Sequence, residues 1–124
     1  DEKQLLGVNL DSNVEIYRAK GCEVCNNTGY KGRIGIHETL VPDDAIRKAI
    51  NEHGITAETL KRMAIENTDM TTLYWDAMEK VRQGITSIED ALANVRRDEF
   101  DSRPQWMFDE LGIKRPQQRT RSAA

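Results

Sequence analysis

Residues 21–38 read Gly21-Cys22-Glu23-Val24-Cys25-Asn26-Asn27-Thr28-Gly29-Tyr30-Lys31-Gly32-Arg33-Ile34-Gly35-Ile36-His37-Glu38. The first part of this stretch is rich in glycine and asparagine, which adopt left-handed turn backbone at little cost. It therefore predicts a tight loop rather than a helix. Cys22 and Cys25 are separated by two residues within that loop. Such a turn brings two thiolates within reach of one Zn²⁺, so we predict that Cys22 and Cys25 are metal ligands.

The predicted metal site is incomplete within this chain. A closed structural zinc site takes four ligands, and the chain offers two cysteines and two histidines, His37 and His53. His37 falls in a segment expected to be extended, and His53 falls at the end of an expected helix. Both histidines are interpreted as surface or packing residues, so two coordination positions have no assigned ligand.

A redox function is the alternative interpretation of the same motif. Cys-x-x-Cys also serves thioredoxin-like proteins, where the first cysteine lies at a helix N-terminus within a βαβ layout. Here the residues after the pair, Asn26-Asn27-Thr28-Gly29, continue a turn. This continuation favours metal binding over redox chemistry.

Short extended segments flank the loop, and helices follow it. Alternating apolar residues predict strands at residues 14–18 and 33–41. Further along, apolar residues recur at helical spacing, and capping residues and glycines divide the chain into helices. The expected helices begin at Pro42 or Asp43, at Thr56, at Thr71 or Thr72, and at Ser87, with a short fifth helix from Pro104.

The expected fold class is mainly α, with a small β and zinc-knuckle front end followed by a bundle of four to five helices. The expected parts are a partial knuckle with an extended segment (1–41), a helical subdomain (42–97), a short extra helix (98–113) and a disordered basic tail (114–124). Each helix needs an apolar stripe to hold it in place. The predicted inward-facing residues are Ile46 and Ile50, then Leu60 and Ala64, then Leu73, Ala77 and Val81, then Ile88, Leu92 and Val95.

Composition narrows the classes of function. Hydrophobic residues make up 38% and charged residues 31% of the chain, which is typical of a soluble domain. The formal net charge of -3 argues against nucleic acid as a partner. No apolar run approaches the roughly 20 residues of a membrane helix. The start resembles no signal peptide and lacks an initiator Met, so we expect a piece cut from a longer protein.

The stretch from residue 21 to residue 38 closely resembles the second cysteine pair and the following strand of the type II secretion and type IV pilus assembly ATPases. Similarity continues through Val41-Pro42-Asp43-Asp44-Ala45-Ile46-Arg47, Met70-Thr71-Thr72-Leu73, Asp76-Ala77, Lys80-Val81 and Gly84-Ile85-Thr86-Ser87-Ile88-Glu89-Asp90. The resemblance covers roughly residues 16–95. Asp69 replaces a usual glycine and His37 a common aromatic residue, while residues 96–124 extend beyond the usual end of the family.

The resemblance implies a cytoplasmic hexameric motor with a RecA-like core, peripheral to the inner membrane. Its partners would be the other subunits of the homo-hexamer and the inner-membrane platform proteins of the machine. It implies that Cys22 and Cys25 share zinc with an upstream cysteine pair, and that the segment after them adds to the core sheet. ATP and magnesium would be bound only by the parent protein, because this chain lacks the GxxxxGK[ST] phosphate loop.

The sequence is therefore compatible with two functions. The first is a C-terminal structural and assembly module of such an ATPase, without a nucleotide site of its own. The alternative is a free-standing zinc-binding or redox adaptor domain that shares only the knuckle.

Overall fold

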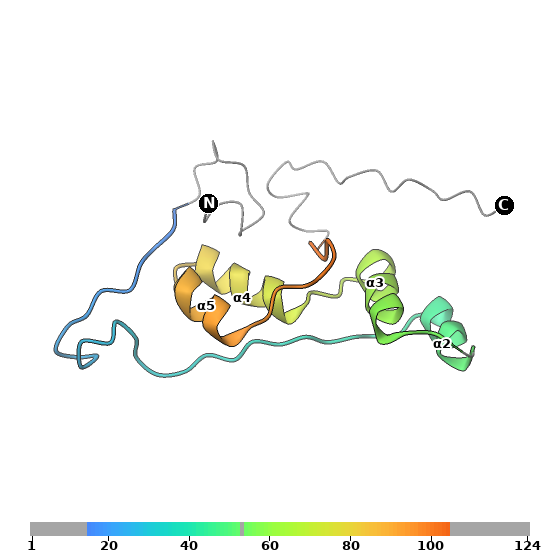
Figure 1. The fold of residues 1–124 in the computed structure, drawn as a ribbon, viewed down its shortest axis with the longest axis horizontal. Helices are drawn as coiled ribbons and strands as arrows, with labels where there is room; N and C mark the ends of the chain where they lie inside the picture. Colours follow the sequence, from blue (N-terminus) through green and yellow to red (C-terminus); the bar gives the residue numbers. More distant parts are fainter. Residues whose placement is uncertain (1–14, 53, 105–124) are drawn as a thin grey trace.

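The computed structural model describes residues 15–52 and 54–104, which contain four α-helices (Figure 1). They are α2 (Asp44–Asn51), α3 (Ala57–Asn67), α4 (Leu73–Arg82) and α5 (Ile88–Asn94). The mainly α class is thereby confirmed. Among the described residues, no helix is long and apolar enough to cross a membrane.

Each helix begins where a side-chain oxygen caps its first turn. An N-cap oxygen accepts a hydrogen bond from a backbone N–H that has no partner within the helix, and this favours initiation at that residue. The four caps and the amides they accept from are Asp43 with Ile46, Thr56 with Thr59, Thr72 with Trp75, and Ser87 with Asp90. The helix starts predicted from sequence are confirmed at all four positions.

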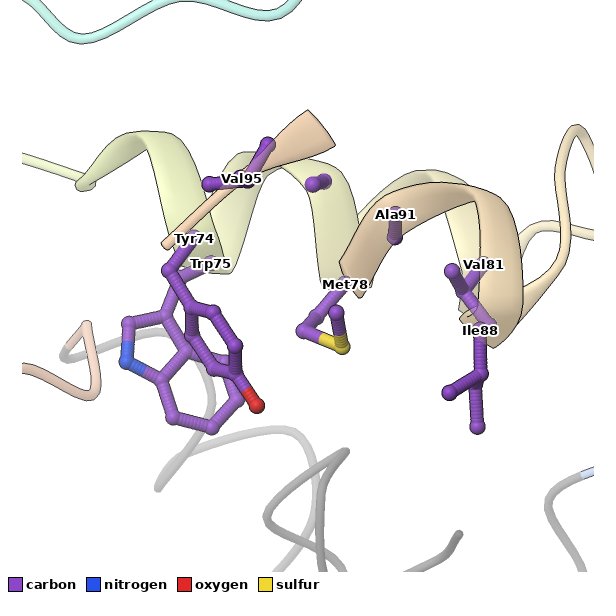
Figure 2. Close-up of a cluster of buried hydrophobic side chains, with 8 residues drawn as sticks. Tyr74, Trp75, Met78, Val81, Ile88, Ala91 and Val95 are labelled. Atoms are coloured by element: carbon purple, nitrogen blue, oxygen red, sulfur yellow. The ribbon is translucent and has the colours of Figure 1, made fainter. Parts of the chain in front are cut away.

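Two apolar cores lie in different parts of the chain. Helices α4 and α5 pack together around the first core, which the partly buried Ile16 and Ile36 also contact. Figure 2 shows the residues of this core: Tyr74, Trp75, Ala77, Met78, Val81, Ile88, Ala91 and Val95. Helices α2 and α3 pack together around the second core, made of Ile46, Ala64, Ile65 and Met70.

Three residues predicted to face inward are exposed instead. Leu73 is 40% exposed and Leu92 is 41% exposed. In α4 the buried stripe begins one position later, at Tyr74, because the larger aromatic surface of Tyr74 and Trp75 takes the core-facing side. The short helix α5 buries only the face turned to α4, which leaves Leu92 outside. In α2, Ile50 is 52% exposed, since Ile46 and Ala49 form its buried face.

The two predicted strands carry no ladder in the described part of the chain. Residues 15–18 and 33–41 contain no assigned strand, because a strand requires a neighbouring strand for its backbone hydrogen bonds. Hydrogen bonds with α4 hold the segment 33–41 instead. The backbone N–H of His37 donates to Asp76 Oδ2 at 2.8 Å, and the N–H of Leu73 donates to Glu38 Oε2 at 2.9 Å.

The C-terminal predictions fall partly outside the described residues. Residues 98–104 carry no helix. The remainder of the expected extra helix, residues 105–113, and the expected basic tail, residues 114–124, lie outside the described residues.

Candidate metal-binding loop

The backbone of the cysteine loop folds back on itself. Asn27 N donates to Cys22 O at 2.8 Å, and Asn26 N donates to Glu23 O at 3.3 Å. Asn26 and Asn27 have φ values of 56° and 62°, in the left-handed region that asparagine tolerates better than most residues. Asn26 and Asn27, on which the predicted turn was based, therefore form the end of that turn.

This turn brings the two thiols together. Cys22 Sγ and Cys25 Sγ lie 3.3 Å apart. Two thiolates on one tetrahedral zinc, each at about 2.3 Å from the metal, lie roughly 3.8 Å from each other. Cys22 is exposed and Cys25 is partly buried, so both sulfurs can be reached from solvent. The two sulfurs are therefore slightly closer together than two thiolates on one zinc.

Hydrogen bonds lower the pKa of Cys25 to about 7. The largest cause is the contact with the Cys22 side chain, followed by the backbone N–H groups of Gly29 and Cys22. Each of these amides lies 3.2 Å from Cys25 Sγ. Donors directed at sulfur stabilise the thiolate, which is the form that binds metals.

Two glycines make the loop this tight. A Cβ at Gly21 would lie 2.9 Å from Asn27 O, which belongs to the backbone and cannot move aside. Gly29 has a φ of +83°, and a Cβ there would lie 2.7 Å from the Cβ of Ala19. The loop therefore needs glycine at both positions, one on each side of the cysteine pair.

Among the described residues, the two cysteines have no further metal ligand beside them. No group of three or more His, Cys, Asp or Glu side chains able to hold a metal occurs among them. His37 is therefore not brought to the thiols. Its ring lies over Gly35, with Cε1 only 2.7 Å from where a Cβ on that glycine would be. His53 lies outside the described residues. The two cysteines fit zinc in donor type and spacing, but need further ligands to close the site.

The segments beside the loop are docked on the turn between α4 and α5. The hydroxyl of Tyr30 is hydrogen-bonded to Ser87 Oγ, 57 positions away. Arg18 Nη1 lies 3.1 Å from Glu89 Oε1. These contacts place the loop against the start of α5. Sequence reasoning missed them, because it identified Ser87 only as a cap and had no signal for a tyrosine partner so distant in the chain.

Comparison with known proteins identifies the family. A family model described as "Type II/IV secretion system protein" matches residues 2–93. The chain is 39% identical to the type II secretion system protein E of Aeromonas hydrophila over 98 residues, covering 78% of this chain and 19% of the relative. It is 49% identical to the type IV pilus assembly ATPase PilB of Thermus thermophilus over 80 residues, covering 64% of this chain and 9% of that relative.

A third relative is the type II secretion system ATPase E of Vibrio cholerae, 44% identical over 77 residues, covering 62% of this chain and 15% of the relative. The chain thus spans about a fifth or less of the length of these relatives. No solved structure matches it. Since the family match runs through the cysteine loop and into α5, the chain belongs to the type II/IV secretion system protein family.

Proposed function

We propose that this chain is the C-terminal structural and assembly module of a hexameric cytoplasmic ATPase that drives type II secretion or type IV pilus assembly. The observation that carries the proposal is the family match across residues 2–93, which contains the two-thiol loop, the helices α2, α3 and α4, and all of α5 except its last residue, Asn94. ATP and magnesium belong to the parent protein, since this chain has no phosphate loop.

The cysteine loop would serve as a structural cross-link. Cys22 and Cys25 would hold zinc together with a second cysteine pair from another part of the parent polypeptide. When bound, zinc would supply folding stability rather than reaction chemistry, as structural sites of this kind do. The N–H groups of Gly29 and Cys22 support this role, because they orient Cys25 Sγ and favour its thiolate.

Exposed apolar side chains support an assembly role. In the extended segment Ile34 is 51% exposed and Val41 is 66% exposed. In the pair α4–α5, Ile85 of the connecting turn is 50% exposed and Leu92 is 41% exposed. Contacts with other protein would remove these apolar side chains from water, which is favourable. The partners we propose are the rest of the parent ATPase, its neighbours in the homo-hexamer and the inner-membrane platform proteins, at the cytoplasmic face of that membrane.

A redox adaptor remains the second candidate, because the two sulfurs are close and the pKa of Cys25 is lowered to about 7. However, a dithiol of the thioredoxin type has its first cysteine at a helix N-terminus. Residues 23–27 form a turn here, and no helix follows it directly. The loop therefore supports metal binding better than thiol exchange.

The experiment uses the full-length parent ATPase. An Ile34→Asp variant places a charge on an exposed apolar position of the extended segment. We expect a lower hexamer fraction in sedimentation and a lower rate of ATP turnover. Thr39→Asp is the matched control, because it adds the same charge to an exposed polar position of the same segment. Unchanged assembly and turnover in the Ile34→Asp protein would contradict the proposal.

A further inference from the structure

Residues 96–104 follow α5 and lie beyond the end of the family match at residue 93. They contain no helix, yet Pro104 is buried and Ser102 is only 1% exposed. In Figure 1 this orange segment runs from α5 back toward α3. It is therefore a packed element with its own contacts.

The chain from Val95 to Phe100 touches both cores. Val95, directly before it, is buried in the core of α4 and α5. Phe100 packs against the core of α2 and α3, and the guanidinium carbon of Arg62 lies 4.7 Å from the centre of its ring. A stretch of a few residues thus spans from one helical pair to the other.

Asp98 lies between these two contacts and joins both pairs. Its Oδ1 is 3.2 Å from Nζ of Lys61 in α3. Its Oδ2 accepts a hydrogen bond of 2.7 Å from the hydroxyl of Thr72, the N-cap of α4, and also accepts from Ser102. The Asp98 side chain is only 11% exposed, so these donors replace most of its water.

The network extends to two further elements. Trp75 Nε1 in α4 donates to Ser102 Oγ at 2.9 Å, both groups being buried. On the other side, Lys61 Nζ lies 3.2 Å from Glu38 Oε2 in the extended segment. A polar network of this kind is satisfied only when all its elements hold one arrangement, and a partly satisfied one is costly.

We propose that residues 96–104, which we call the clasp, hold the pair α2–α3 in one orientation relative to the pair α4–α5. The contacts of Asp98 keep the clasp closed. Each pair has its own core, so each can keep its helices when the clasp opens. Asp98 fixes the orientation between the pairs by bonding to donors on both sides at once. Glu38 also contacts Lys61 of α3 and the N–H of Leu73 in α4, so opening the clasp would widen the range of orientations between the two pairs without separating them.

The test measures the distance between spin labels on exposed positions of α2 and α5, Lys48→Cys and Ala93→Cys, in a chain with Cys22→Ser and Cys25→Ser. The clasp predicts one narrow distance distribution. Asp98→Asn removes the charge that pairs with Lys61, and the distribution should broaden at least twofold while circular dichroism shows unchanged helix content. Glu99→Gln, an exposed neighbour that loses the same charge, should keep the narrow distribution.

An unchanged narrow distribution in Asp98→Asn would overturn the proposal, as would equal broadening in Glu99→Gln. If Asp98→Asn loses its helices, Ser102→Ala decides instead, because it removes the hydroxyl between Asp98 and Trp75 and leaves the Lys61 ion pair. Broadening with helices retained supports the clasp, and a wild-type distribution overturns it. Hydrogen exchange gives a second readout: faster exchange confined to residues 96–104, with all four helices still protected, supports the clasp, and equal acceleration in all four helices overturns it.

Discussion

Asp76 Oδ2 accepts a hydrogen bond of 2.8 Å from the backbone N–H of His37, a residue 39 positions away. The other oxygen of the carboxylate accepts from Lys80 Nζ at 2.8 Å, one turn along the same helix. The Asp76 side chain is 20% exposed. The extended segment is therefore held on α4 by a charged side chain and not by a strand ladder.

Replacing Asp76 with alanine should loosen that attachment. Hydrogen bonds to a charged group contribute about 1.5–3 kcal/mol, so we expect Asp76→Ala to lower the free energy of unfolding by about 2 kcal/mol in urea titrations. Glu58→Gln is the control, since Glu58 forms an exposed ion pair with Arg62 on the surface of α3, and such pairs contribute about 0.3–0.5 kcal/mol. Equal effects of the two substitutions would show that Asp76 does not fix the segment.

The one-position shift of the buried stripe in α4 can be tested by two truncations. Met78 is 1% exposed, and Met78→Ala should cost about 2–5 kcal/mol through lost burial and a cavity. Leu73 is 40% exposed, and Leu73→Ala should cost less than about 1.5 kcal/mol, because much of its side chain is already in water. Urea unfolding measures both. A Leu73→Ala cost equal to that of Met78→Ala would restore the stripe predicted from sequence.

Acid should remove the contribution of Glu79. Burial by itself raises the pKa of Glu79, but hydrogen bonds from Arg82 and Gln83 and the nearby positive charges outweigh it, so the pKa is lowered on balance. A carboxylate with a lowered folded pKa stabilises the fold above its unfolded pKa, about 4.3. This stabilisation is lost as the pH falls through the folded pKa.

The measurement compares the unfolding free energies of wild type and Glu79→Gln between pH 6 and pH 3. The wild-type advantage should be largest near pH 6 and should shrink toward pH 3. An advantage that stays constant or grows with acid would contradict the sign of the pKa shift.

Metal analysis tests whether the cysteine loop is half of a zinc site. Two thiolates leave two coordination positions to other groups, so this chain alone should bind zinc far more weakly than a complete site. A longer chain that carries a second cysteine pair should retain one zinc per molecule through dialysis, and Cys22→Ser should release it. Tight stoichiometric zinc in the monomeric 124-residue chain would show that the site is completed from within.

Features that depend on neighbouring residues could be predicted from sequence. Thr72 and Ser87 cap helices because their oxygens reach amides three positions along the same chain. The cysteine turn is equally local, since Asn27 N bonds to Cys22 O. Periodicity found the helices and two buried residues of α4, Ala77 and Val81, but it placed the start of the buried face at Leu73 instead of Tyr74, because these two apolar residues are adjacent.

Contacts between distant residues could not be predicted. The bond between Tyr30 and Ser87 joins positions 57 apart, and the ion pair of Lys61 with Asp98 joins positions 37 apart. Neither the residue type nor the spacing along the chain predicts a partner at such a distance in sequence. Asp98 in particular has the sequence context of a solvated charge, within Arg96-Arg97-Asp98-Glu99, and it becomes a largely buried junction only in the fold.

The sequence by itself determined the four helix starts, the tight cysteine turn and the resemblance to secretion and pilus ATPases. The helix starts and the turn depend on hydrogen bonds between residues a few positions apart. The resemblance depends on the order of residues in the stretch 21–38. Only the tertiary structure decided where the buried face of α4 begins, how the extended segment is held, and that residues 96–104 contact two helical pairs. These features are stabilised by burial of apolar surface and by hydrogen bonds and ion pairs between residues dozens of positions apart. Such residues come together only once the chain has folded.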